Sequence, residues 1–243
     1  MGNTMGGLDF SFLKEYFPVF LEGAKWTLII SAITVILGAL LGTILCFMKR
    51  SKFSIFKVKI LRVISTAYVE VIRGTPLLLQ IYIVYFGLPS FGIQLEVLPS
   101  CIIAISLNSA AYVSEIIRAG IDAVDKGQLE AARSLGMAEG MAMRLIILPQ
   151  AIKNILPAIG NEFVAIIKES SMASTIGVAE LMYSSKIVTG ATYKGFEPLI
   201  VIAMFYFVMT FSLGRVMSYV EKRLSKSWLM LEIYIKVLVK MRF

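Results

Sequence analysis

Long apolar runs dominate this chain and constrain its fold more than any other feature. An α-helix needs about 20 mostly apolar residues to cross a bilayer. Five runs reach that length, the fourth with an interruption: 26–48, 60–86, 97–117, 155–183 and 197–219. Only 16% of the residues are charged, whereas soluble domains carry about 25%. The sequence therefore predicts an all-α integral membrane protein with about five transmembrane helices.

The basic residues indicate which connections face the cytoplasm, because cytoplasmic loops carry an excess of Lys and Arg. The first connection contains basic residues and no acidic ones: Lys49, Arg50, Lys52, Lys57, Lys59 and Arg62. With five spans, this places the amino terminus outside and the carboxyl terminus in the cytoplasm. The net charge of +8 then reflects orientation, and we expect no nucleic acid partner.

Three regions follow from this topology. Residues 1–25 form an outer segment, in which residues 8–22 suit a helix lying in the membrane interface. Residues 26–224 form the transmembrane domain, with a cytoplasmic insert at 122–154. Residues 225–243 form an apolar tail that is short for a span, so we expect it to lie in the interface.

The insert has the pattern of two short helices. Residues 130–149 read EAARSLGMAEGMAMRLIILP, and Gly136 can adopt the left-handed conformation that ends a helix. We expect a second helix after Gly136, limited by Pro149 and followed by a bend at Pro157. On periodicity alone, an ordinary cytoplasmic loop is equally consistent with this segment.

Several charged residues lie within or at the end of spans, where they need a partner or a water-filled path. Glu70 and Arg73 are three residues apart and can pair just before Pro76 breaks the second span. The alternative is a discontinuous helix that lines a translocation path. Glu115 and Arg118 repeat the spacing at the end of the third span, where a pair would anchor the insert.

Polar residues also mark the middle of the third and fourth spans. Asn108 and Ser109 lie about halfway through the third span, followed by Tyr112. They fit a central polar site or helix packing equally well. By helical rise, Lys168-Glu169-Ser170-Ser171 lies near the midplane. We predict that Glu169, Ser170 and Ser171 line a substrate path.

No catalytic motif is present. The chain has no GxxxxGK[ST] loop, GxSxG elbow, HExxH motif or histidine. Cys46 and Cys101 lie in apolar runs without a CxxC pattern, so we expect neither a disulfide nor a metal site. Three classes of function remain: a transporter subunit, a channel and an intramembrane enzyme. A channel would show a filter or a charge ring, and the enzyme would need two convergent acids.

Taken together, these motifs resemble a known family. The insert is similar to the EAA signature of the permease subunits of bacterial ABC importers. Its matching residues are Glu130-Ala131-Ala132, then Gly136, then Ile146 to Pro149. Three further segments resemble the polar amino-acid uptake branch of this family: Arg73 to Gln80, Ala111 to Ile121, and Gly160 to Phe163 with Lys168 to Ser171. The resemblance covers about residues 18–224, and the tail departs from it.

The resemblance implies an importer subunit of the bacterial cytoplasmic membrane that moves a polar amino acid, such as glutamine or cystine, by alternating access. It implies a second permease copy, an extracytoplasmic amino-acid-binding protein, and an ATPase that carries the ATP and Mg. The expected docking residues are Glu130, Ala131, Ala132, Gly136, Leu148 and Pro149.

The resemblance also carries over Asn108 as a substrate ligand, with Glu169 and Met172 nearby. A pair between Glu169 and Lys168 would leave the pocket nearly neutral, which suits glutamine or cystine. The alternative function is an amino-acid or ion channel, or a secondary transporter, that works without an ATPase.

Overall fold

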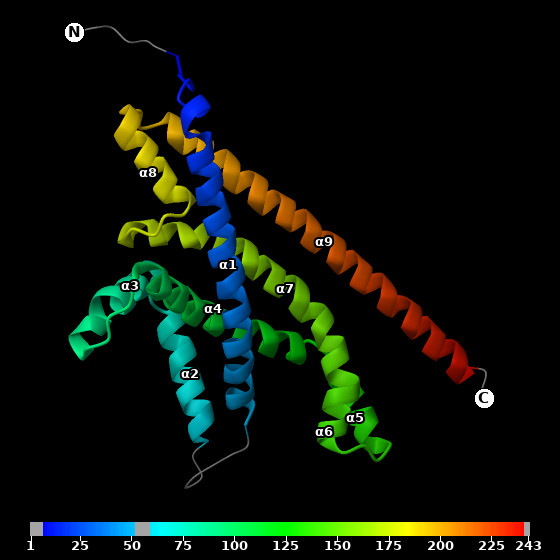
Figure 1. The fold of residues 1–243 in the computed structure, drawn as a ribbon. Helices are drawn as coiled ribbons and strands as arrows, with labels where there is room; N and C mark the ends of the chain where they lie inside the picture. Colours follow the sequence, from blue (N-terminus) through cyan, green and yellow to red (C-terminus); the bar gives the residue numbers. More distant parts are fainter. Residues whose placement is uncertain (1–6, 52–58, 241–243) are drawn as a thin grey trace.

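The computed structural model describes residues 7–51 and 59–240, with side chains as far as Arg223. Within these ranges the chain is built from helices, without a β-strand (Figure 1). The α-helices are α1 (Leu13–Arg50), α2 (Ile60–Arg73), α3 (Leu77–Tyr82), α4 (Val97–Asp122), α5 (Lys126–Ser134), α6 (Glu139–Ala142), α7 (Leu148–Glu169), α8 (Leu181–Thr192) and α9 (Glu197–Lys240). Turns of π-helix (η1, Ile83–Gly87; η3, Met143–Ile147) and 3₁₀-helix (η2, Leu88–Phe91; η4, Ser170–Ile176) connect some of them.

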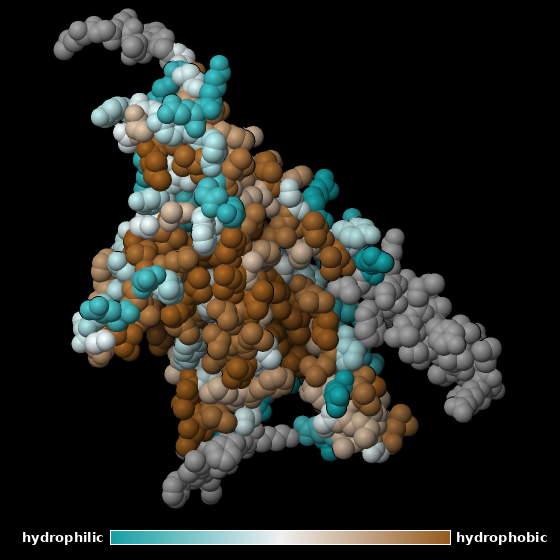
Figure 2. All heavy atoms as spheres, in the orientation of Figure 1, coloured by the Kyte–Doolittle hydropathy of each residue, from teal (hydrophilic) through white to brown (hydrophobic). Residues whose placement is uncertain are grey.

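Among the described residues, four helical segments are long and apolar enough to span a membrane: Leu13–Arg50, Val97–Asp122, Glu139–Ile176 and Glu197–Arg223. A fifth span is broken, because Ile60–Arg73 and Leu77–Phe91 meet at 108°. Figure 2 shows hydrophobic side chains over the middle of the visible face and hydrophilic ones toward the ends. The all-α membrane fold with about five spans is thus confirmed.

The amino-terminal part of α1 differs from expectation. Residues 8–22 do not form a separate helix, since a single helix runs from Leu13 to Arg50 and includes Pro18. The reason is burial: Phe20 and Ala24 pack with Leu181 of α8 and Ile202 of α9 in one core cluster. This packing holds the first turns of α1 against the bundle, and their expected location in the membrane interface stays a prediction.

Two glycines bring α1 and α4 into close contact. A Cβ atom on Gly38 would lie 2.6 Å from Ser109 Oγ, and one on Gly42 would lie 2.8 Å from the Ala110 carbonyl oxygen. Both distances are shorter than van der Waals contact, so only glycine fits. Small residues four apart on one helix face are a common way to join membrane helices closely. Here they let α1 pack directly against the middle of α4.

The insert contains the two expected short helices, but its second helix does not end at Pro149. Gly136 has φ +82° and separates α5 from α6 in the left-handed conformation. The chain then continues through η3 into α7, where Pro149 occupies the first turn. A helix tolerates proline there because that N–H needs no helical acceptor. Pro157 likewise lies inside α7, so neither proline ends it.

The last helix is longer than a bilayer requires. The backbone of α9 is helical from Glu197 to Lys240, so the tail region begins as a continuation of the last span. Its expected location in the interface stays a prediction, and residues 241–243 lie outside the described part of the chain.

Candidate functional site

The break in the second span lies between α2 and α3 and is closed by side chains. Pro76 is extended (φ −63°, ψ 138°) and precedes α3. The Gln80 amide nitrogen donates to the carbonyl oxygens of Ile72 (2.8 Å) and Thr75 (3.1 Å). Carbonyl groups that a break leaves without helical donors must find other partners at membrane depth. Gln80 supplies these donors.

Asn108 of α4 is joined to this break. Its Nδ2 donates to Gln80 Oε1 at 2.9 Å, and both side chains are buried. Asn108 therefore holds α4 against the bent span. Gln80 was absent from the candidate residues, although its position one turn after Pro76 in an apolar run was a usable signal.

A polar face of α7 lies opposite the middle of α4. Ser109 Oγ is buried without a hydrogen-bond partner among the described residues. The Glu162 carboxyl group interacts with it at longer range, and also with Glu169. Glu162 and Glu169 are seven residues apart and share a helix face. The structure thus adds Glu162 to the candidate site.

An ion pair between Glu169 and Lys168, which the sequence left open, is absent from the described residues. Within the described residues the two side chains form no ion pair, and Lys168 lines a cavity of about 350 Å³ beside Tyr206 of α9. Adjacent residues on a helix point about 100° apart, so α7 directs them to different surroundings. Glu169 is half-buried, and Lys168 interacts with it electrostatically without forming an ion pair.

The residues after Glu169 form η4 and bond mainly within it. Ser170 Oγ donates to the Ile167 carbonyl oxygen (2.9 Å) and Ser171 Oγ donates to that of Lys168 (2.6 Å). Met172 packs against the core cluster that includes Ile81. Ser170 is fully buried, whereas Ser171 and Met172 are partly exposed. Of these three, Ser171 also lines the cavity beside Lys168.

Arg73 does not pair with Glu70. Its guanidinium carbon lies 5.2 Å from the ring centroid of Tyr112, and no ion pair joins Glu70 and Arg73 in the described part of the chain. A guanidinium group over an aromatic face is attracted by the ring electrons. The bend at Pro76 and the approach of α4 make this contact available, so Tyr112 connects α4 to the broken span.

Glu115 and Arg118 form their ion pair at 2.9 Å, and it belongs to a network. Lys49 of α1 also pairs with Glu115, at 2.6 Å. Arg50 and Arg118 both pair with Asp122, each at 2.9 Å. The network joins the ends of α1 and α4 where the insert begins.

The insert exposes a tip at the end of α5. Leu135 is 85% exposed, and Glu130, Ala131 and Gly136 are also exposed. Ala132 instead is buried and faces the interior of the insert. A single exposed apolar side chain is common on protein surfaces, so the position of Leu135 within the insert, next to Gly136, is what makes it a candidate contact. Leu135 was not among the expected docking residues, while Leu148 and Pro149 are only partly exposed.

A buried carboxylate joins three helices at the start of α8. Glu180 is fully buried, caps α8 by accepting hydrogen bonds from the backbone N–H groups of Met182 and Tyr183, and accepts another from Tyr206 Oη at 3.0 Å. Thr27 of α1 also reaches it, at 3.4 Å. Glu180 therefore joins α1, α8 and α9.

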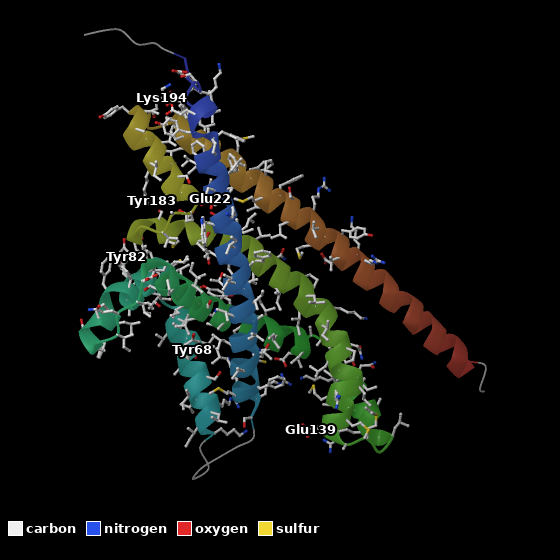
Figure 3. The ribbon with its side chains drawn as sticks, viewed as in Figure 1. Glu22, Tyr68, Tyr82, Glu139, Tyr183 and Lys194 are labelled. Carbon is white, nitrogen blue, oxygen red and sulfur yellow. The ribbon has the colours of Figure 1, made fainter. Side chains whose placement is uncertain are left out.

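A surface ion pair lies beyond the other end of α8. Lys194 pairs with Asp9, and this contact, together with hydrogen bonds from Ser11, lowers the pKa of the Asp9 carboxyl group to about 2. Figure 3 shows Lys194 and Glu139 at opposite ends of the bundle, so this ion pair and the insert belong to different ends.

Comparison with known proteins decides what this arrangement is. Residues 35–226 match the family described as the binding-protein-dependent transport system inner membrane component. The chain belongs to this family. It is accordingly a multi-pass inner-membrane permease subunit of the ABC importer type, and ATP hydrolysis resides in a separate subunit. An ATPase and a substrate-binding protein are its partners by family membership.

Individual relatives agree with the family. The permease is 45% identical over 221 residues to the arginine transport system permease protein ArtQ of Bacillus subtilis, covering 90% of this chain and 99% of that protein. It is 43% identical over 219 residues to a putative glutamine transport system permease protein of Rickettsia bellii, covering 88% and 98%.

Solved structures confirm the fold. The chain matches a crystal structure of an amino acid ABC transporter with histidines, with TM-score 0.85 and 47% identity, covering 90% of this chain and all of that one. A methionine ABC transporter in an inward-facing conformation shares the fold at 15% identity, with TM-score 0.71. These findings favour the importer over the channel or secondary transporter.

Proposed function

We propose that this permease carries a polar amino acid across the membrane by alternating access, driven by an ATPase docked on the tip of α5. The exposed Leu135 beside Gly136 carries the proposal. The tip is built on a short helix whose buried Ala132 fixes it to the rest of the insert. A push on the tip is thereby transmitted through η3 into α7, which is one of the spans.

The proposal extends to the rest of the assembly. Glu130 and Ala131 lie exposed on the helix that ends at Leu135, so they extend the surface offered to the ATPase. ATP and Mg would be held by that partner. The insert then lies in the cytoplasm, with the amino terminus outside, where a binding protein delivers the amino acid. A second permease copy, identical or related, completes the path.

The proposed class of substrate rests on the acidic residues Glu162 and Glu169 of α7. Glu162 and Glu169 form no ion pair with a described Lys or Arg, so a bound amino acid could supply the positive charge. Lys168 interacts with Glu169 without forming an ion pair, and Glu162 and Glu169 also act on each other. Two acidic groups so close at this depth are costly, and a cationic side chain would lower that cost. This favours an arginine-like substrate over glutamine, as in one relative's name. Glutamine remains the second candidate, because other relatives are named for it.

Docking is tested by changing Leu135 alone. Leu135→Asp places a charge at an apolar contact without disturbing the core, since the side chain is 85% exposed. We expect the ATPase subunit to be lost during purification of the variant complex. Tyr193→Asp is the matched control, because Tyr193 is 93% exposed at the opposite end. Retention of the ATPase by Leu135→Asp, or its equal loss from the control, would contradict docking at the tip.

A further inference from the structure

A basic cavity of about 740 Å³ lies where α1 and α4 end and α2 begins, beside α6. Five of its lining residues are cationic and two are acidic: Lys49, Arg50, Lys59, Arg62 and Arg118 against Asp122 and Glu139. Here the excess is positive, so the cavity suits an anion.

The cations do not all have partners in the protein. Lys49, Arg50 and Arg118 belong to the ion-pair network with Glu115 and Asp122. Lys59 and Arg62, in contrast, form no ion pair with any acidic residue that the structure describes. Both come from the start of α2 and are exposed. They are the groups that a bound anion would neutralise.

The amino terminus of α2 carries cations, which the dipole of the helix disfavours. Lys59 occupies the N-cap position and makes no capping hydrogen bond, and the first turn contains no acidic residue. A helix amino terminus carries partial positive charge and free N–H groups, so cations there are unfavourable and anions are favourable. An anion at this position would bond the N–H groups and offset the charges of Lys59 and Arg62.

Exposed apolar side chains lie on the same helix ends as these cations. Phe47 lines the same cavity and is 59% exposed. Val63 and Ile64, which follow Arg62 in α2, are more than half exposed. A free phosphate ion needs no such surface, whereas the acyl chains of a lipid do. The pattern of basic pocket and adjacent apolar surface at the cytoplasmic end of spans is typical of headgroup binding.

We infer that this cavity binds the phosphate-bearing headgroup of an anionic phospholipid from the inner leaflet. The phosphate lies between Lys59, Arg62 and the amino terminus of α2, and the acyl chains follow Phe47, Val63 and Ile64. Because Glu139 and Gly140 of α6 line the same cavity, the lipid contacts the insert as well as the spans. The inference rests on the cytoplasmic placement of this end in the proposed function.

The test titrates the detergent-purified permease–ATPase complex with phosphatidylglycerol or phosphatidylcholine of identical chains and counts bound lipid by native mass spectrometry. We expect tighter retention of phosphatidylglycerol. Lys59→Gln with Arg62→Gln should weaken it about 30-fold, as expected for two cations at a headgroup. The matched control is Lys222→Gln with Arg223→Gln, two exposed cations of α9 outside the cavity, which should change binding less than about twofold.

The other outcomes overturn the inference. Unchanged phosphatidylglycerol binding by the double variant removes the site, and an equal loss in the control shows a general effect of charge. Displacement of the lipid by millimolar inorganic phosphate identifies a free anion as the ligand. If the double variant fails to fold, Lys59→Arg with Arg62→Lys should keep the affinity, and loss there contradicts the inference. Retention of the ATPase is scored separately, so failure here leaves docking at Leu135 unaffected.

Discussion

Asn108 Nδ2 donates a 2.9 Å hydrogen bond to Oε1 of Gln80, and this bond joins the middle of α4 to the helix that restarts after Pro76. Gln80 Nε2 in turn donates hydrogen bonds to the carbonyl oxygens of Ile72 and Thr75. One pair of amide side chains therefore supplies donors for the carbonyl groups at the break and holds the broken span against α4.

This pair gives the first prediction. Gln80→Ala leaves the Ile72 and Thr75 carbonyls and the Asn108 amide without partners, which should lower the free energy of unfolding by about 1–3 kcal/mol. Thermal unfolding of Gln80→Ala, Asn108→Ala and the double variant measures their coupling. We expect the double variant to be no worse than Gln80→Ala. Additive losses would mean that the two side chains act separately.

Transport by the same variants tests whether Asn108 also contacts substrate. A purely structural Asn108 should change the substrate concentration for half-maximal uptake by the same factor as Gln80→Ala. A direct contact should raise it further, by about tenfold for one lost hydrogen bond to a charged group. Uptake assays at several substrate concentrations distinguish the two roles.

The close contact between α1 and α4 gives the second prediction. Gly38→Ala places a methyl group 2.6 Å from Ser109 Oγ, so the helices must separate, at a cost of about 1–3 kcal/mol. Gly214→Ala in α9 is the matched control, because nothing lies within 4 Å of its Cβ position. It should be neutral or stabilising by up to about 1 kcal/mol. Equal unfolding temperatures for both variants would argue against the packing.

The polar face of α7 gives the third prediction. If Glu162 and Glu169 receive a cationic amino acid, Glu169→Gln should weaken arginine uptake about tenfold or more and glutamine uptake much less. Glu22→Gln serves as the control, since Glu22 is more than half exposed and pairs with Lys25. Competition between labelled arginine and unlabelled glutamine measures the ratio. An equal effect on both substrates would favour a neutral substrate pocket.

The orientation gives the fourth prediction. The native Cys46 and Cys101 are buried, so added cysteines can be labelled selectively with a membrane-impermeant maleimide. In intact cells, the Tyr193→Cys variant should react and the Leu135→Cys variant should not. Both should react after permeabilisation when the permease is produced without its ATPase subunit, which would otherwise cover Leu135. The reverse pattern would place the insert outside and contradict the proposed topology.

The sequence predicted the features that depend on neighbours along the chain. Apolar runs located the spans, Pro76 indicated the break, and Gly136 indicated the junction between α5 and α6, because local sterics decide each of these. The end expected at Pro149 was wrong, since η3 and the first-turn position accommodate the proline.

The features it missed depend on partners distant in the chain. Asn108 meets Gln80 across 28 residues, and Glu180 meets Thr27 across 153. No local pattern records such pairs. The continuity of α1 past Pro18 has the same origin, since it is fixed by packing on α8 and α9. Arg73 illustrates the opposite error, because its spacing from Glu70 suggested a pair, whereas the bend brought Tyr112 within reach.

Two parts of the permease are fastened by different kinds of bond. Glu180 joins α1, α8 and α9 with hydrogen bonds in a dry interior, where breaking them leaves buried groups unsatisfied. The ion pairs of Arg50 and Arg118 with Asp122, in contrast, are partly open to water, which replaces them at little cost. Rocking of the helices would therefore pivot about Glu180, and the ends near Asp122 would swing apart.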